Sequence, residues 1–170
     1  MPETEPLQLL EALHREIDQQ AQVLVARHAG RIACRRGCAD CCIDGLTSFE
    51  IEAERIRRHH TELLARGRPH PPGRCAMLDE LGACRIYPDR PYICRTQGLP
   101  LRWLEETASG ELAEHRDVCP LNLTDLSLLE LPDEAFWRLG PVEQRLAELQ
   151  HRAFGSLRRV ALRELFSARP

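Results

Sequence analysis

The chain has 170 residues, of which 43% are hydrophobic, 29% are charged and only 5% are aromatic, and its formal net charge is −3. This size and balance are typical of one globular domain. The small negative charge gives no general attraction for nucleic acid or for an acidic membrane surface, so neither is expected as a partner. All 23 basic residues are arginines, which excludes enzymes that depend on a Schiff-base lysine or a phosphate-loop lysine.

The N-terminal segment Met1–Gln20 is acidic and amphipathic. It lacks the basic start, the apolar stretch and the small-residue cleavage site of a signal peptide. No apolar run in the chain approaches the roughly 18 residues that cross a bilayer. We therefore expect a cytoplasmic protein. In that reducing compartment, a cysteine-rich pattern indicates metal binding or catalysis rather than disulfides.

Two helices are expected in the N-terminal part of the chain. Apolar residues that recur at steps of three and four predict a helix over residues 5–29, which ends at Gly30. Thr47 and Glu50 have the spacing of a capping box. They predict a second helix that begins at Thr47 and ends at Gly67.

The C-terminal part is expected to be helical as well. A short helix is predicted near Pro132–Leu139, and Gly140 with Pro141 separates it from a long final helix over residues 141–166. The middle of the chain is rich in turn residues, with room for short strands only. The fold class is therefore α+β and mostly helical: a single domain over residues 1–170, with flanking helices around a cysteine-bearing core at 34–119. The expected strands are Ala83–Tyr87, Pro100–Leu104 and Glu111–His115, the last two joined by a turn at residues 108–110.

The cysteines are the main candidates for function. Soft thiolates at short spacing suit zinc, iron–sulfur clusters or copper(I). Eight thiolates suffice for one site or for two, and the sequence leaves both open. Because neighbouring side chains diverge, one of Cys41 and Cys42 can face a different metal or remain a free thiol. The candidate ligands are Cys34, Cys38, Cys41, Cys42, Cys75, Cys84, Cys94 and Cys119.

Several arginines lie near these cysteines in the sequence. Four thiolates around Zn²⁺ carry a net charge of −2, which is costly to bury unless it is neutralised. We expect the arginines to donate hydrogen bonds to sulfur, with a solvated surface as the alternative. They are Arg35, Arg36, Arg74, Arg85, Arg90 and Arg95.

The cysteine pattern resembles the bacterial CxxCxxCC cysteine-cluster proteins, the YkgJ family. The resemblance is carried by Cys34-x3-Cys38-x2-Cys41-Cys42, by Cys75, by Cys84-Arg-Ile-Tyr-Pro-Asp-Arg-Pro-Tyr-Ile-Cys94-Arg, and by Cys119-Pro. It implies a zinc- or iron-chelating domain in which all eight cysteines are candidate ligands, and such proteins are often named Fe–S oxidoreductases. The first spacing here is x3, where the family name shows x2.

Other assignments remain open at this point. Cys34-x3-Cys38-x2-Cys41 is also the spacing with which radical-SAM enzymes hold a [4Fe–4S] cluster, although Asp40 stands where they favour an aromatic residue. His115 is the best spare ligand, ahead of His59 and His60.

We expect a metal-binding protein that chelates iron, as an Fe–S cluster or as the ion, with zinc as the alternative metal. An Fe–S-dependent oxidoreductase or methyl-transfer enzyme is the alternative function, and a redox-sensitive thiol switch is a third. The asymmetric cysteine spacing favours iron–sulfur slightly over zinc.

Overall fold

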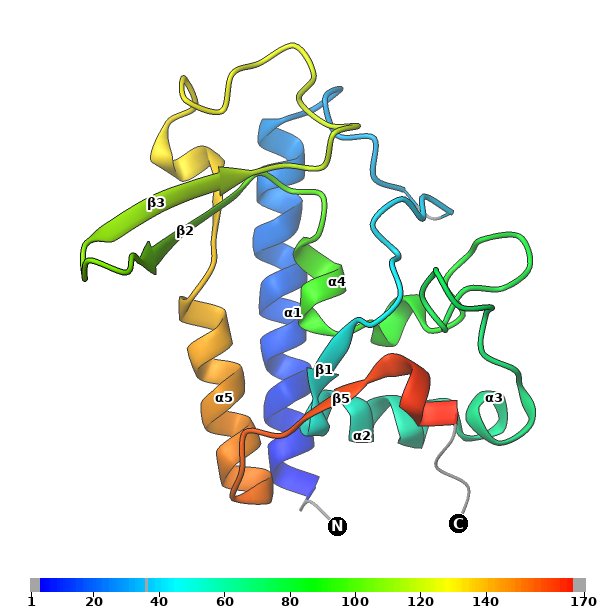
Figure 1. Cartoon of the computed structure of the whole chain (residues 1–170). Helices are drawn as coiled ribbons and strands as arrows, with labels where there is room; N and C mark the ends of the chain where they lie inside the picture. Colours follow the sequence, from blue (N-terminus) through cyan, green and yellow to red (C-terminus); the bar gives the residue numbers. More distant parts are fainter. Residues whose placement is uncertain (1–3, 36, 167–170) are drawn as a thin grey trace.

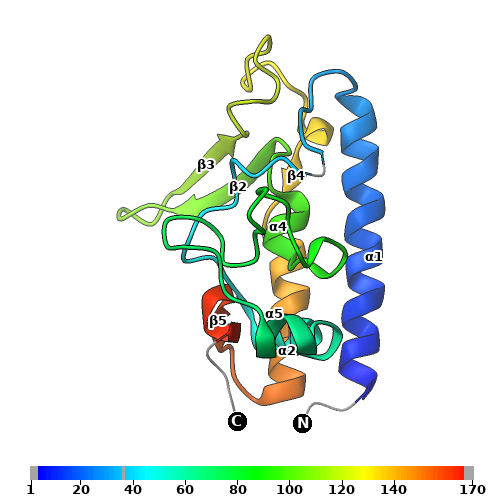
Figure 2. The ribbon, with the colours of Figure 1, turned by 90° about the vertical axis from the view of Figure 1, so that its right-hand side faces the viewer.

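Helix α1 (Thr4–Arg27) lies next to α5 in Figure 1 and along one edge of the molecule in Figure 2, and it contributes one face of the core. Our description rests on a computed structural model and covers residues 4–35 and 37–166. The other helices are α2 (Glu50–His59), α3 (Thr61–Arg66), α4 (Tyr92–Thr96) and α5 (Pro141–Phe154), with 3-10 turns at Tyr87–Asp89, Asp133–Ala135 and Leu162–Phe166. The strands are β1 (Thr47–Phe49), β2 (Leu101–Glu106), β3 (Leu112–Asp117), β4 (Trp137–Arg138) and β5 (Arg159–Ala161). These elements confirm the α+β fold class.

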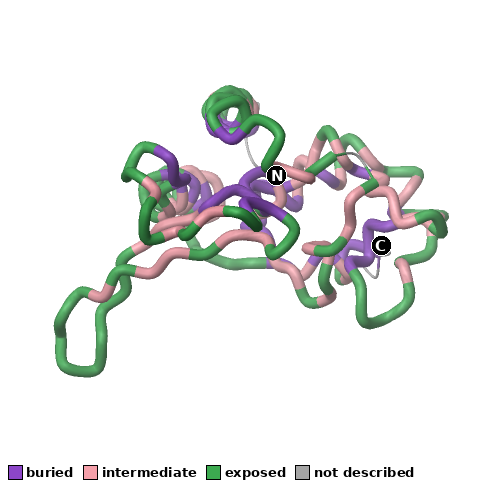
Figure 3. Tube along the Cα trace, turned by 90° about the horizontal axis from the view of Figure 1, so that it is seen from above, coloured by how far each residue is buried: buried purple, intermediate pink, exposed green. Residues whose placement is uncertain are grey.

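The strands form two small sheets. In the first, β1 and β5 pair antiparallel, with Ser48 opposite Val160. In the second, the strand order is β3-β2-β4, and β2 pairs antiparallel with β3 and parallel with β4. The β2–β3 hairpin projects from the rest of the molecule, and its tip is exposed (Figures 1 and 3). The hairpin was expected from the sequence and is confirmed, each strand beginning one residue later and ending two residues later than predicted.

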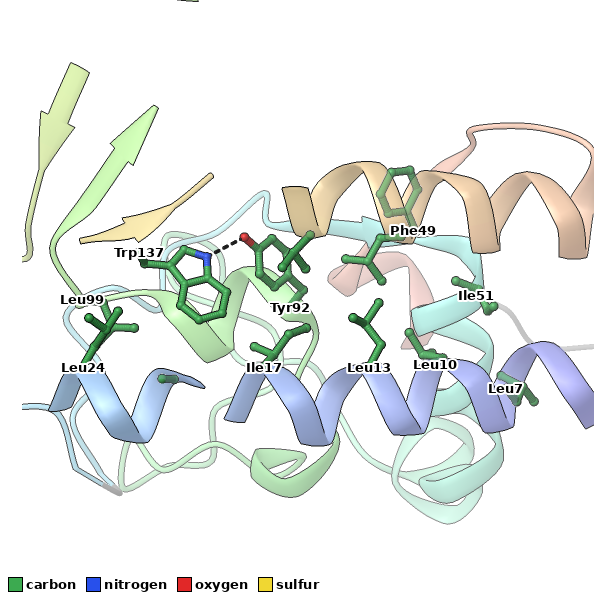
Figure 4. Packing of buried hydrophobic residues seen from close by; sticks show 13 residues of the cluster. Leu7, Leu10, Leu13, Ile17, Leu24, Phe49, Ile51, Tyr92, Leu99 and Trp137 are labelled. Carbon is green, nitrogen blue, oxygen red and sulfur yellow. Dashed lines mark hydrogen bonds between the residues drawn. The ribbon is translucent and has the colours of Figure 1, made fainter. Parts of the chain in front are cut away.

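The buried apolar side chains form two clusters. The larger one lies between α1 and α5 and includes Leu10, Ile17 and Leu146, each at most 1% exposed. At its end the Trp137 indole Nε1 donates a hydrogen bond of 2.9 Å to the Tyr92 hydroxyl (Figure 4). The smaller cluster packs Ile56 of α2 against Met77, Ile86 and the C-terminal turn. Since Ile51 belongs to the first cluster and Ile56 to the second, α2 joins the two.

The predicted second helix differs from the structure at its start and in its middle, whereas its predicted end at Gly67 is confirmed as the C-cap of α3. Thr47 does not cap a helix, because residues 47–49 are strand β1, held by pairing with β5. The helix begins at Glu50, and the carboxylate of Glu52 accepts a hydrogen bond from the Phe49 N–H at 3.3 Å. The helix then breaks at His60, so that α2 and α3 replace one long element.

Of the two C-terminal helix predictions, the first was wrong and the second was too long. The expected helix near residues 132–139 is a 3-10 turn followed by β4, which is drawn into the sheet by pairing with β2. The final helix ends at Phe154, where Gly155 adopts the left-handed conformation (φ 65°) that closes many helices. The chain then returns as β5 and a 3-10 turn, because Val160 and Leu165 are buried in the smaller cluster.

The predicted strand Ala83–Tyr87 is also absent from the described residues. Cys84 forms an isolated antiparallel bridge with Leu78, and Tyr87 begins a 3-10 turn. Pro88, which has no N–H to donate, follows at once and prevents further pairing. The segment is nevertheless held in a two-stranded arrangement at the position of the cysteine.

Gln150 gives a direct test of how α5 supports α2. Its side chain is 0% exposed, and its Oε1 accepts a hydrogen bond of 2.9 Å from the Ile51 N–H in the first turn of α2. Gln150→Ala leaves that buried N–H without a partner, and we expect a loss of about 2 kcal/mol in the free energy of unfolding. Chemical denaturation measures it. The matched control is Gln144→Ala, an exposed position of the same helix, which should change stability by less than about 0.5 kcal/mol; equal losses in the two variants would contradict the assignment.

Candidate metal centre

Seven of the eight cysteines line one cavity of about 460 Å³. They come from three separate parts of the chain, and the cavity wall between them includes Met77, Ile86 and Leu99. The cysteines of the cavity are Cys34, Cys38, Cys41, Cys42, Cys75, Cys84 and Cys94. The fold therefore gathers thiols that the sequence separates by dozens of positions.

The first four cysteines lie on a segment that contains turns but no helix or strand in residues 31–35 and 37–46. The Cys38 N–H donates to the Arg35 carbonyl at 3.0 Å, and the Cys42 N–H donates to the Ala39 carbonyl at 3.0 Å. In Figures 1 and 2 this segment crosses from the end of α1 to β1. Tight turns of this kind place several thiols on a short length of backbone.

The second part of the chain pairs directly with the end of the first. The Cys75 N–H donates to the Cys42 carbonyl at 2.9 Å, next to an antiparallel bridge between Ile43 and Arg74. Three residues further, Leu78 bridges to Cys84. Backbone pairing thus places Cys42, Cys75 and Cys84 on neighbouring stretches of the chain.

The Asp44 side chain stabilises the pairing of these two segments through hydrogen bonds. Its carboxylate accepts hydrogen bonds from the Gly73 N–H at 3.0 Å and from the Arg163 Nε at 2.9 Å. The Arg163 guanidinium and the Gly73 N–H lower the pKa of Asp44 below its ordinary value. One side chain therefore links two cysteine-bearing segments to the C-terminal 3-10 turn.

Cys94 is positioned by α4, which is anchored on α1 and α2. The buried carboxylate of Glu52 accepts a hydrogen bond of 2.7 Å from the Tyr92 N–H at the start of α4, and it lies 3.1 Å from the His14 Nε2. Arg95 donates to Asp18 of α1 at 2.6 Å. These polar contacts hold the helix, and with it the Cys94 thiol, against the cavity.

Cys34 and Cys119 are brought together by Asn122. The Asn122 Nδ2 donates to the Cys34 sulfur at 3.3 Å and to the Gly98 carbonyl at 2.6 Å, and the Asn122 N–H donates to the Cys119 carbonyl at 2.8 Å. Cys119 is not among the residues that line the cavity. Sequence reasoning missed Asn122, which is 2% exposed, because it carries no metal-binding pattern of its own.

The thiols differ in acidity for two physical reasons. Burial raises the pKa of Cys75, Cys84 and Cys94 above the ordinary thiol value. The Cys42 thiol donates a hydrogen bond to Cys41, which lowers the pKa of Cys41 to about 6 and raises that of Cys42. Cys41 is therefore the thiol most readily ionised at neutral pH among those with a resolved shift.

Four of the six arginines donate hydrogen bonds to backbone carbonyls or to a carboxylate, where the sequence predicted donation to sulfur. Arg74 donates to the Ala39 carbonyl at 2.9 Å, and Arg85 donates to the Ala76 carbonyl at 2.8 Å. Arg90 donates to the Tyr87 carbonyl at 2.9 Å. These three arginines donate their hydrogen bonds to the backbone of the cysteine loops, while the charges of Arg85 and Arg90 act to lower the pKa of the Cys84 thiol against the effect of burial. Arg35 lines the cavity, and Arg36 lies outside the described residues.

The histidines proposed as spare ligands lie elsewhere. His115 stacks on Trp103 in the projecting hairpin, with ring centroids 5.3 Å apart, and its Nε2 is 3.3 Å from Glu105. His59 and His60 both contact the carboxylate of Asp89, at 3.0 Å and 2.9 Å. None of these three histidines lines the cavity.

Comparison with known families agrees with the arrangement of the cysteines. The sequence model of a family described as a proposed zinc- or iron-chelating domain, CxxCxxCC, matches residues 33–120, just over half of the chain. The chain belongs to the CxxCxxCC family. The match includes all eight cysteines and confirms the resemblance read from the sequence. No match was found among the curated proteins or among the solved structures.

The donors of the CxxCxxCC domain fit zinc and iron in kind, because thiolates are ligands of both. Among residues 4–35 and 37–166, no three His, Cys, Asp or Glu side chains lie close enough together to form a ready-made metal site. The thiols thus share one cavity without being drawn into coordination geometry. None of the helices described combines the length and the apolar character that crossing a bilayer requires.

Proposed function

We propose that this CxxCxxCC protein chelates iron, as an Fe–S centre or as the ion, through the thiolates of its cysteine cavity, with zinc as the competing metal. The observation that carries the proposal is the convergence of seven cysteines from three parts of the chain on one cavity. Buried cysteines that merely fill a core have no reason to gather in this way. Cys119 lies outside the cavity lining but is joined to Cys34 through Asn122, and it completes the proposed ligand set.

The size of the cavity supports a centre larger than one ion. Four thiolates around one zinc ion, with Zn–S bonds of about 2.3 Å, need sulfurs only about 3.8 Å apart. A cavity of about 460 Å³ lined by seven thiols exceeds that need. It has room for a polynuclear Fe–S centre or for more than one metal.

The experiment that tests the proposal is purification under anaerobic conditions with quantification of iron, zinc and acid-labile sulfide. Iron with sulfide and a broad absorption band near roughly 400 nm identify an Fe–S centre. Zinc in a colourless sample identifies the competing metal. Adventitious binding by surface histidines is controlled with His115→Ala and His151→Ala, which should retain the full metal content. A folded protein without metal, indifferent to added iron or zinc, would overturn the proposal.

Metal uptake is expected to release protons. Burial raises the pKa of Cys75, Cys84 and Cys94, so these thiols are protonated at pH 7.0 in the metal-free chain and must lose a proton to bind metal. Apparent affinity should therefore fall as the pH is lowered. Titration of the metal-free protein with zinc in a weakly buffered solution containing a pH indicator measures the release; uptake without release would show that these thiols are not ligands.

A further inference from the structure

Asn122 is a buried side chain that donates a hydrogen bond to a cysteine sulfur of the cavity. It is 2% exposed, and its Oδ1 accepts a hydrogen bond of 2.7 Å from the Ala33 N–H. Its Nδ2 donates to the Gly98 carbonyl at 2.6 Å and to the Cys34 sulfur at 3.3 Å. Both hydrogens of the amide are therefore used, and one of them goes to a proposed metal ligand.

The partners of Asn122 fix the orientation of its amide group. The Ala33 N–H can only donate, so the amide oxygen faces it. The Gly98 carbonyl can only accept, so the amide nitrogen lies on that side. The group next to the Cys34 sulfur is therefore an N–H donor and not a carbonyl oxygen. Such a donor matches a sulfur that carries negative charge, as a metal-bound thiolate does.

The backbone beside this amide is held at a conformational cost. Leu123 is the one non-glycine residue with a positive φ (50°) among those that the structure describes. A residue with a β-carbon keeps this left-handed conformation only where its surroundings enforce it. Leu123 is 3% exposed, and its N–H donates to the Arg31 carbonyl at 2.9 Å. On the other side, the Asn122 N–H donates to the Cys119 carbonyl at 2.8 Å. The fold thus fixes the position from which the amide reaches the cavity.

Cys34 has little packing of its own to hold it in place. It is exposed, whereas the other seven cysteines are buried or half-buried. It lies on a stretch, residues 31–35, that has no helix or strand. The position facing its sulfur is Gly98, where a β-carbon would overlap the sulfur, so no side chain can pack there. The orientation of the Cys34 sulfur therefore depends on the Asn122 amide.

We propose that Asn122 is a positioning residue of the metal centre, and that its amide N–H stays hydrogen-bonded to the Cys34 sulfur when that sulfur binds metal. The proposal rests on the chelating function proposed above and adds to it a residue outside the cysteine pattern. The hydrogen bond orients an exposed ligand before the metal arrives. It also offsets part of the negative charge that thiolates bring into the cavity, which is the role that the sequence predicted for arginines.

Alkylation of the cysteines in the zinc-loaded full chain tests this role. Iodoacetamide labels free thiols, and mass spectrometry assigns each label to a cysteine, so protection by zinc is measured residue by residue. In the wild-type protein zinc should slow the labelling of Cys34 by at least about tenfold. In Asn122→Ala this protection should be lost while Cys75 and Cys94 stay protected. The overall affinity for zinc should fall by about 10–100-fold.

Gln150→Ala is the matched control, because it removes another fully buried amide, one that bonds to a backbone N–H and does not line the cavity. This variant loses stability, yet zinc should protect its Cys34 to within about twofold of the wild-type value. Equal loss of protection in the two variants would show that Asn122 acts through stability alone and would overturn the proposal. Full protection of Cys34 in Asn122→Ala would overturn it as well.

A measurement on the wild-type protein makes the test independent of whether a variant folds. The protein is loaded with an NMR-active cadmium isotope, which binds thiolates as zinc does. We expect a scalar coupling between cadmium and a side-chain amide proton of Asn122, because the hydrogen bond to a metal-bound sulfur transmits it. Cadmium-loaded protein without this coupling would contradict the proposal. Wild-type protein that takes up neither zinc nor cadmium would refute the chelating function itself, and this role of Asn122 with it.

Discussion

Stripping the metal from the purified protein is expected to lower the midpoint of thermal unfolding by about 10 °C or more. The cysteine-bearing stretches at residues 31–35, 37–46 and 67–86 contain only turns, bends and isolated bridges. The metal–sulfur bonds proposed above would therefore be their strongest cross-links. In a chain of this size a loss of 1 kcal/mol shifts the midpoint by about 2–4 °C. A loss of only about 4 kcal/mol, well below the free energy of a structural zinc site, therefore suffices. Differential scanning calorimetry with and without a chelator measures the shift.

Proteolysis of the metal-free protein can show which segments lose stability. Proteolysis of the stripped protein should cut first within residues 31–46 and 67–86, while α1 and α5 stay protected by the larger core cluster. Adding the metal back should restore both the midpoint and the protection. A stripped protein with an unchanged midpoint and an unchanged cleavage pattern would show that no metal holds these segments.

Gly98→Ala is expected to displace Cys34 and to destabilise the protein by about 3 kcal/mol. Gly98 has φ 95°, a conformation that costs a residue with a β-carbon about 1 kcal/mol or more. A β-carbon at this position would also overlap the Cys34 sulfur, and such overpacking adds about 1–3 kcal/mol. Chemical denaturation measures the stability, and the purified variant should contain less metal than the wild-type protein.

Gly110→Ala is the matched control. Gly110 also has a positive φ, 83°, but its β-carbon would meet only the Glu106 side chain, at 3.9 Å, in the exposed turn of the hairpin. The backbone strain is therefore similar and the contact with a cysteine is absent. We expect a loss of about 1 kcal/mol and an unchanged metal content. If the two variants were equally stable and bound zinc equally, the close approach of Gly98 to Cys34 would contribute neither to stability nor to metal binding.

Sequence patterns correctly predicted the elements that depend on residues close together in the chain. The apolar series on α1 places Leu10, Leu13 and Ile17 on one face, and that face is buried as expected. The β2–β3 hairpin was recognised from the turn at residues 108–110, which the structure closes with a hydrogen bond between the Thr107 N–H and the Glu111 carbonyl. In both cases a periodicity or a turn signal lies within a few residues of the structure that it specifies. The boundary of a single domain over residues 1–170 stays a prediction.

Elements that depend on distant partners were predicted wrongly. Thr47 has the local pattern of a helix cap, but its backbone pairs with Ala161, more than a hundred positions away. The apolar residues after Gly155 continue a helical periodicity, yet they are buried by a strand and a 3-10 turn against Ile56 and Met77. Tertiary pairing outweighs local propensity in both places, because burial against a distant element contributes more free energy than helix propensity does.

By itself the sequence determined the chemistry of this protein: eight thiols, their family, and the helices that flank them. Only the tertiary structure decided which thiols meet. The Cys75 N–H donates to the Cys42 carbonyl, and the Asn122 side chain donates to the Cys34 sulfur, so that segments far apart in the sequence bring their cysteines to one cavity. The sequence specifies which side chains are present. Hydrogen bonds and burial between segments far apart in the sequence decide which of them become neighbours in space.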